Sequence, residues 1–184
     1  MSNIAEMLAR WDSGDGKPYK GKLIDWREFE RDPTNIGCMC AQGQALHLLG
    51  GWPPEKLRDT DQEQADRETA KLLNISIAHS ILLRSINDGV DGAPSIVLTH
   101  PEKVLGDQAK IVLAFWLHLD GMTGGDWQKV AAAWDAAGDA AWAAAWAASE
   151  IQGAALMREP FFFLPMFGFA SPEEIPALPE GYGL

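Results

Sequence analysis

Cysteine and basic residues are scarce in this chain. The sequence holds two cysteines, and 15 Lys and Arg stand against 26 Asp and Glu, which gives a formal net charge of -11. Two cysteines separated by one residue cannot staple a domain, so a disulfide-built scaffold is excluded and a reducing cytoplasm is expected. Broad contact with nucleic-acid phosphates needs clustered Lys and Arg, so the charge argues against it. An acidic mimic of nucleic acid stays open.

A long apolar run is also missing. The longest apolar stretch, at about 140–148, is mostly alanine and lies between Asp139 and Glu150, so no membrane span is predicted. The first ten residues include Glu6 within their apolar pattern and form no basic leader, so no secretory signal is predicted.

Tryptophan, in contrast, is abundant. The chain has 184 residues, enough for one domain, and eight of them are tryptophan. A tryptophan buries a large area and carries one hydrogen-bond donor, so this composition indicates an extensive core or aromatic anchors in an interface.

Helical spacing dominates the pattern. Ile4, Met7, Leu8 and Trp11 follow the i, i+3, i+4, i+7 rule, and glycines end that helix. Further helices are predicted at about 38–49, after Pro53-Pro54, from a Thr60/Glu63 capping box to about residue 73, from a Ser76 cap to about residue 87, and after Asp107. Ser95–Thr99 is the one strand-like stretch, and Leu23–Phe29 is ambiguous between strand and helix. The predicted fold is mainly α, a single compact domain with at most a minor β element.

One long helix is predicted from about Asp126 to Met157. Its alanine content gives it high intrinsic helix propensity. Four rings share one arc of it, and small residues occupy the opposite side, so both sides are expected to pack against neighbours. Gly138 is a candidate kink or close crossing. The rings are Trp127, Trp134, Trp142 and Trp146.

An apolar, proline-broken segment follows. We place a helical domain at 1–160 and a C-terminal tail at 161–184 that packs on the domain or on a neighbouring subunit, because exposed phenylalanines in this number would promote aggregation. With the long helix, this tail predicts a homo-oligomer. The interface candidates in it are Phe161, Phe162, Phe163 and Phe167.

Two thiols and an imidazole lie close in the sequence. Cys38, Cys40 and His47 form a partial zinc set, with no fourth ligand at a fixed spacing. A cysteine nucleophile paired with one of the four histidines is the enzymatic alternative. The third interpretation is that the cysteines are small buried hydrophobes. No cofactor is predicted, and the balance is against an enzyme.

The segment 61–87 has the rhythm of a helix-turn-helix DNA reader. Ser76, His79 and Arg84 are its candidate DNA-binding residues. The second helix is otherwise apolar, however, and a groove-reading helix needs polar side chains for base edges. A structural helix hairpin is the competing interpretation.

Two further candidate sites contain acidic residues. Asn87, Asp88 and Asp91 could hold calcium, although turns use the same residues. Asp135 and Asp139 lie four apart on the long helix and could form a carboxylate pair, or a solvated edge.

Several stretches carry a resemblance to known sequences. They are Cys40–Gly43, Ala114–Asp120, the Ala/Trp repeat running through Ser149–Met157, and Pro160–Pro165. Over most of its length the chain resembles a group of bacteriophage and prophage proteins with no assigned function. The resemblance implies a phage or bacterial setting and transfers no catalytic residue.

Together these features predict a non-enzymatic, phage-type accessory protein that acts through protein–protein contacts, one form of which would be modulation of a host or defence protein. The alternatives are a structural component of a phage particle and a helix-turn-helix regulator. The expected location is the bacterial cytoplasm, or the virion if the protein is structural.

Overall fold

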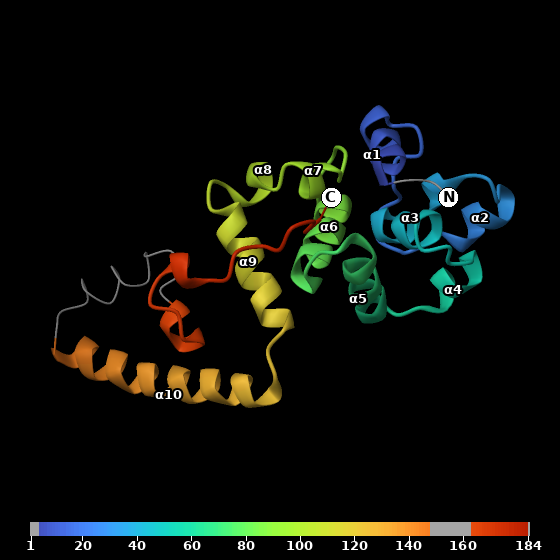
Figure 1. Cartoon of the computed structure of the whole chain (residues 1–184). Coiled ribbons are helices and arrows are strands. Elements are labelled where there is room, and N and C mark those ends of the chain that lie inside the picture. The colour runs from blue at the N-terminus through green and yellow to red at the C-terminus, as the bar shows by residue number, and fades with distance from the viewer. Residues whose placement is uncertain (1–3, 148–162, 184) are drawn as a thin grey trace. The chain divides into compact units, whose positions relative to one another are not determined.

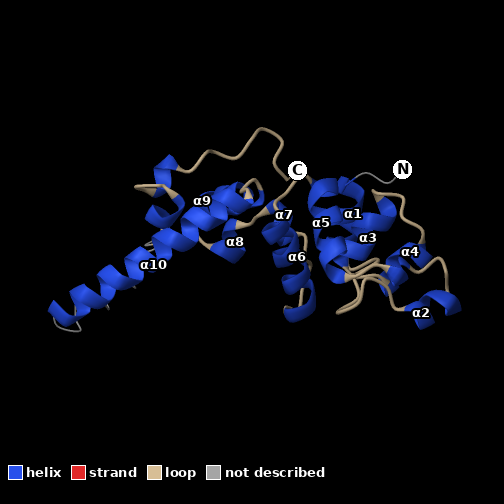
Figure 2. Cartoon of the chain, turned by 90° about the horizontal axis from the view of Figure 1, so that it is seen from below, coloured by secondary structure: helices blue, strands red, loops and turns tan. Residues whose placement is uncertain are grey.

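The structure, a computed structural model, describes residues 4–147 and 163–183, and the side chains of these residues except 137–147. Helices and loops make up the described residues, with one isolated antiparallel bridge between Ile24 and Met39 (Figure 2). The predicted mainly α fold is confirmed. None of the described helices is both long enough and apolar enough to cross a membrane.

The contacts divide the chain into two compact units (Figure 1). Unit 1 comprises residues 1–117 and 178–184, and unit 2 comprises residues 118–177. The division therefore falls at different places from the boundary predicted at residue 160, and the last residues of the chain return to unit 1.

Unit 1 is an assembly of short helices. Its first helix presents the predicted apolar face, since Met7, Leu8 and Trp11 are buried in the larger core cluster. That cluster also includes residues of four later helices, so helices distant in sequence share one core. The helices are α1 (Ile4–Ser13), α2 (Trp26–Arg31), η1 (Ile36–Cys38), α3 (Ala41–Leu48), α4 (Pro54–Asp59), α5 (Gln62–Leu73), α6 (Ile77–Gly89), α7 (Ile96–Thr99), α8 (Glu102–Leu105) and most of α9 (Ala109–Asp120).

The turn between α5 and α6 follows the sequence signals closely. Asn74 adopts left-handed backbone with φ of 52°, which ends α5. The Ser76 hydroxyl accepts a hydrogen bond from the His79 amide, as the predicted cap requires. The cap of α5 differs from the prediction, because Asp61 and not Thr60 accepts from the Gln64 amide. The Thr60 hydroxyl instead donates to Lys56 O, so it closes the preceding helix.

The strand predicted at Ser95–Thr99 is wrong, because Ile96–Thr99 is the helix α7. Its β-branched residues favour a strand locally, but Val97 and Leu98 are buried in the core cluster. The Ser95 hydroxyl donates to the carboxylate of Asp12, near the end of α1, which fixes the start of α7. Tertiary packing therefore overrides local propensity here.

The segment Leu23–Phe29, which is ambiguous between strand and helix in the sequence, contains both conformations. Ile24 and Asp25 are extended, and the helix α2 begins at Trp26.

Helix α3 lies directly against the backbone at Leu23. A Cβ atom at Gly43 would fall 2.0 Å from the Leu23 carbonyl oxygen, so only glycine fits there. The Cys40 amide donates to the same carbonyl at 3.2 Å. This close approach places the two buried glutamines of α3, Gln42 and Gln44, within reach of several other segments.

The C-terminal residues of unit 1 are held at the α5–α6 turn. The Gly183 amide donates to Asn74 O at 2.9 Å, and the Ser76 amide donates to the Tyr182 hydroxyl at 3.1 Å. The Tyr182 ring stacks on His79 with centroids 5.9 Å apart. We call residues 181–183 the latch.

Unit 2 is built on the long helix. α10 begins at Gly124 and is described to Ala147, and it passes through Gly138 without a break. The part of the predicted helix beyond Ala147 lies outside the described residues. Two 3₁₀ turns follow, η2 (Leu164–Phe167) and η3 (Pro172–Glu174), and η2 packs against α10.

Candidate functional site

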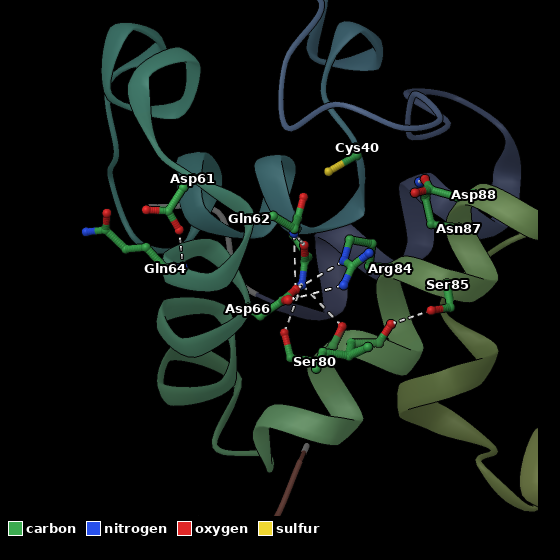
Figure 3. Close-up of polar contacts among 12 residues, drawn as sticks. Cys40, Asp61, Gln62, Gln64, Asp66, Ser80, Arg84, Ser85, Asn87 and Asp88 are labelled. Carbon is green, nitrogen blue, oxygen red and sulfur yellow. Dashed lines mark hydrogen bonds and ion pairs between the residues drawn. The ribbon is translucent and has the colours of Figure 1, made fainter.

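A polar network fills the junction of α3, α5 and α6 in unit 1. Its centre is the buried residue Asp66, which is 5% exposed as a whole. The Gln42 amide donates to this carboxylate at 2.7 Å, and both Arg84 Nε and a terminal Arg84 nitrogen donate to it at 3.2 Å. Figure 3 shows Arg84 and Gln62 pointing toward Asp66.

The same network has little capacity for chemistry. The Asp66 oxygens already accept from two amides and a guanidinium, and the Gln42 amide also donates to the Ser80 hydroxyl. A carboxylate that accepts bonds on every side is a poor general base for a substrate. We interpret this network as a device that fixes how three helices meet.

A second buried glutamine serves the same purpose. Gln44 accepts from the Trp11 indole at 2.8 Å and donates to the carbonyl oxygens of Gly16, Ile36 and Met39. One amide therefore joins α1, η1 and two loops. These two glutamines escaped the sequence analysis because a polar residue beside a glycine usually lies on a helix surface, whereas both are fully buried.

The structure does not bring Cys38, Cys40 and His47 together around a metal. Cys40 caps α3 by accepting from the Gly43 amide, and burial raises the pKa of its thiol to about 11. Burial also raises the pKa of Cys38. The His47 ring bonds to Trp52 O at 2.7 Å. Among the described residues, no three His, Cys, Asp or Glu side chains lie close enough to share an ion, and a thiol with a raised pKa is a weak nucleophile.

The three candidate DNA-binding residues point into unit 1. Ser76 and His79 are buried, and His79 Nε2 bonds to Val97 O at 2.9 Å while its Nδ1 faces the Tyr182 hydroxyl. Arg84 is occupied by Asp66. A side chain used inside the fold cannot reach base edges in a groove, so this geometry favours the structural helix hairpin.

The polar and acidic residues at the end of α6 and just after it also serve the fold. Asp88 accepts from the Gly21 amide at 2.8 Å, and Asn87 donates to Tyr19 O at 2.8 Å. Asp91 pairs with Lys20 at 2.9 Å. These contacts tie the loop at residues 19–21 to the end of α6. They engage carboxylate oxygens of Asp88 and Asp91 that a calcium ion would require.

One open cleft of about 800 Å³ lies between the start of α2 and the α4–α5 connection. The Arg58 guanidinium at its wall already pairs with Asp59 at 2.7 Å and lies 4.6 Å from the Trp26 ring centre. The Asp25 carboxylate is the cap of α2, and its bond from the Glu28 amide lowers its pKa. The lining residues are Gly21, Lys22, Leu23, Ile24, Asp25, Trp26, Arg27, Leu57, Arg58, Thr60 and Gln62.

Two tryptophan side chains of α10 in unit 2 are exposed. Trp127 is 46% exposed and Trp134 is 55% exposed. The Trp127 ring meets Phe167 of η2 edge-on with centroids 6.2 Å apart, and Phe163 packs on Phe167 in the same way. We call Trp127, Trp134, Phe163 and Phe167 the aromatic surface. The other predicted interface residues, Trp142, Trp146, Phe161 and Phe162, lie outside the described side chains.

The described side chains of unit 2 are mostly exposed or half-buried. None of the described α10 side chains from 124 to 136 is buried. In 118–177, the buried positions among the described side chains are Leu164 and Ile175. The chain matches no known family, and neither the characterised proteins nor the solved structures include a significant match to it.

Proposed function

We propose that this is a non-enzymatic protein that acts through protein–protein contacts, and that it self-associates through the aromatic surface. The observation that carries the proposal is the exposure of Trp127 and Trp134 on a helix with no buried side chain from 124 to 136. Large apolar areas left exposed on a folded unit are typical of interaction surfaces. The resemblance to phage proteins supports a phage or bacterial setting for these contacts.

The size of the exposed rings gives the energy scale. A tryptophan buries up to about 250 Å², so rings 46% and 55% exposed leave roughly 250 Å² per copy to cover. At about 25 cal/mol per Å² this is about 6 kcal/mol for each copy, or about 12 kcal/mol for a pair. Association costs about 4–15 kcal/mol in lost freedom. The rings can therefore drive association, provided that the helix backbone contributes contacts too.

The interior of unit 1 supports the non-enzymatic part. The polar groups that could act in catalysis are engaged with one another, as shown for Asp66, Arg84 and His79. The thiols of Cys38 and Cys40 are buried, with raised pKa values. The exposed parts of the Trp127 and Trp134 side chains are thus the feature on which the proposal rests.

Light scattering of the purified protein across about two decades of concentration tests the proposal. We expect the wild-type mass to exceed that of one chain and to fall on dilution, and the double variant Trp127→Ala/Trp134→Ala to be monomeric. Trp52→Ala in unit 1 is the matched control, because Trp52 is partly exposed outside the aromatic surface, and it should associate as the wild type does. Far-ultraviolet circular dichroism checks that all variants remain helical. A wild-type protein that stays monomeric throughout contradicts the proposal.

A further inference from the structure

The exposed face of α10 alternates large and small residues. At about 100° per residue, Ala131, Trp134 and Gly138 all lie within roughly 40° of Trp127 around the helix axis. Their spacing of four, three and four residues is that of a heptad stripe, the pattern by which one helix packs along another. The order along the stripe is large, small, large, small.

This order is complementary to itself when the direction is reversed. We infer, resting on the proposed self-association, that a second copy of this chain packs on α10 in antiparallel register, with Trp134 over Ala131 of the partner subunit and Trp127 over Gly138 of the partner subunit. Each ring then meets a position with little or no side chain. The two-fold axis passes between residues 132 and 133, so each of these contacts occurs twice.

The parallel arrangements are poorer. A parallel pair in register would set ring against ring and alanine against alanine, which leaves gaps that a close-packed interface does not tolerate. A parallel pair shifted by one step would match large to small, but the shift leaves an unmatched end on each copy and continues into an open filament. Only the antiparallel register is both matched and closed.

Charge permits this approach of two acidic chains. The four stripe residues are uncharged, although the chain as a whole carries a formal net charge of -11. Lys129 lies on the far side of the helix from the stripe and pairs with Asp126 of its own chain at 3.0 Å. Like charges are therefore not forced together at the centre of the pair.

The exposed rings alone do not reach the area that a stable pair buries. The exposed rings supply about 500 Å² from two copies, at roughly 250 Å² each, and a stable interface buries about 1,200 Å² or more in total. The remainder has to come from close approach of the two helix backbones, which the small residues Ala131 and Gly138 of the stripe permit. This close approach would explain the glycine at position 138, because α10 passes through Gly138 without a break.

Distances between spin labels test the register in the full-length protein. Gly125→Cys and Ala132→Cys are exposed, and both lie away from the stripe. In the antiparallel pair, residue 132 is offset from its own copy by about 1.5 Å along the axis and residue 125 by about 22 Å. The helix axes of a packed pair lie about 8–10 Å apart, and labels on the outer sides of the two helices are then about 20 Å apart across the pair. The distance between labels at position 125 should therefore be about 10 Å longer than the distance between labels at position 132.

The outcomes separate the two proposals. A longer distance at 125 supports the antiparallel register. Equal distances at both positions overturn the register and leave self-association standing, whereas a monomeric mass with no distance between copies overturns both. Cys38 and Cys40 are buried, so wild-type protein treated with the same reagent serves as the blank.

A pair of leucine variants tests the predicted contact itself. Ala131→Leu fills the space that Trp134 of the partner subunit would occupy, so we expect the dimer dissociation constant to rise at least about tenfold. Ala132→Leu adds the same volume one residue further, on the outer flank, and should leave the constant unchanged. Equal effects of the two changes overturn the assigned face.

Discussion

Replacement of Asp66 is the sharpest test of how unit 1 is held together. In Asp66→Ala, the Arg84 guanidinium loses both of its carboxylate bonds, and the amides of Gln42 and Gln62 each lose an acceptor. Gln42 keeps its bonds to Ser80. The largest change is therefore an uncompensated charge in a part-buried position.

The size of the effect follows from burial. The Asp66 side chain is 8% exposed and the Arg84 side chain is 28% exposed. Removal of one partner of a buried ion pair costs about 3–5 kcal/mol. Because water still reaches part of Arg84, we expect the lower end, about 3 kcal/mol off the free energy of unfolding.

Urea unfolding followed by circular dichroism at 222 nm measures this loss. Asp91→Ala is the control, since it also removes a carboxylate paired with a cation, but Asp91 is 94% exposed and exposed pairs contribute little. Asp66→Asn, which keeps an acceptor of the same shape, should be less destabilised than Asp66→Ala. If Asp66→Ala unfolds at the same urea concentration as Asp91→Ala, the network does not stabilise unit 1.

Three further predictions concern other buried groups. Trp11→Phe should lower the free energy of unfolding by about 1–3 kcal/mol, because the buried Gln44 oxygen loses its donor; an unchanged urea midpoint would show that water replaces the indole. Burial lowers the pKa of His79, so the unfolded state, with a pKa of about 6.5, binds the proton more readily. The stability that His79 contributes is then complete above pH of about 6.5 and is lost as pH falls through the folded-state pKa. His79→Gln should accordingly lose less stability between pH 7 and pH 5 than the wild type, and parallel losses would refute the assignment. The raised pKa and burial of Cys38 and Cys40 predict slow reaction with a thiol reagent at pH 8 until urea unfolds the chain; fast labelling of the native protein would refute this.

Local signals in the sequence were sufficient to predict much of the secondary structure of unit 1. The apolar spacing of α1, the left-handed Asn74 and the Ser76 cap all act within one turn of helix, so the residues themselves determine the outcome. The α7 segment could not be predicted in this way, because its conformation depends on packing by residues distant in sequence. A β-branched run alone favours a strand.

The candidate DNA-binding residues show the same limit of sequence-based prediction more strongly. Ser76, His79 and Arg84 have suitable spacing for a helix-turn-helix reader, but spacing does not say which side of a helix faces inward. Asp66 and Val97, distant from them in sequence, occupy two of the three. The aromatic surface, by contrast, was signalled by tryptophan excess, and exposure at Trp127 and Trp134 is what the structure adds.

The latch has a consequence for the order in which the chain can fold. Residues 178–184 belong to the same unit as residues 1–117, so residues 118–177 are an insertion between two parts of one folding unit. On the ribosome, the turn at Asn74 emerges long before Tyr182 and Gly183 can bond to it. Unit 1 therefore acquires its last contacts only after the aromatic helix has been synthesised. A fully bonded unit 1 should thus form only once residues 182 and 183 have emerged, when the aromatic helix is already present.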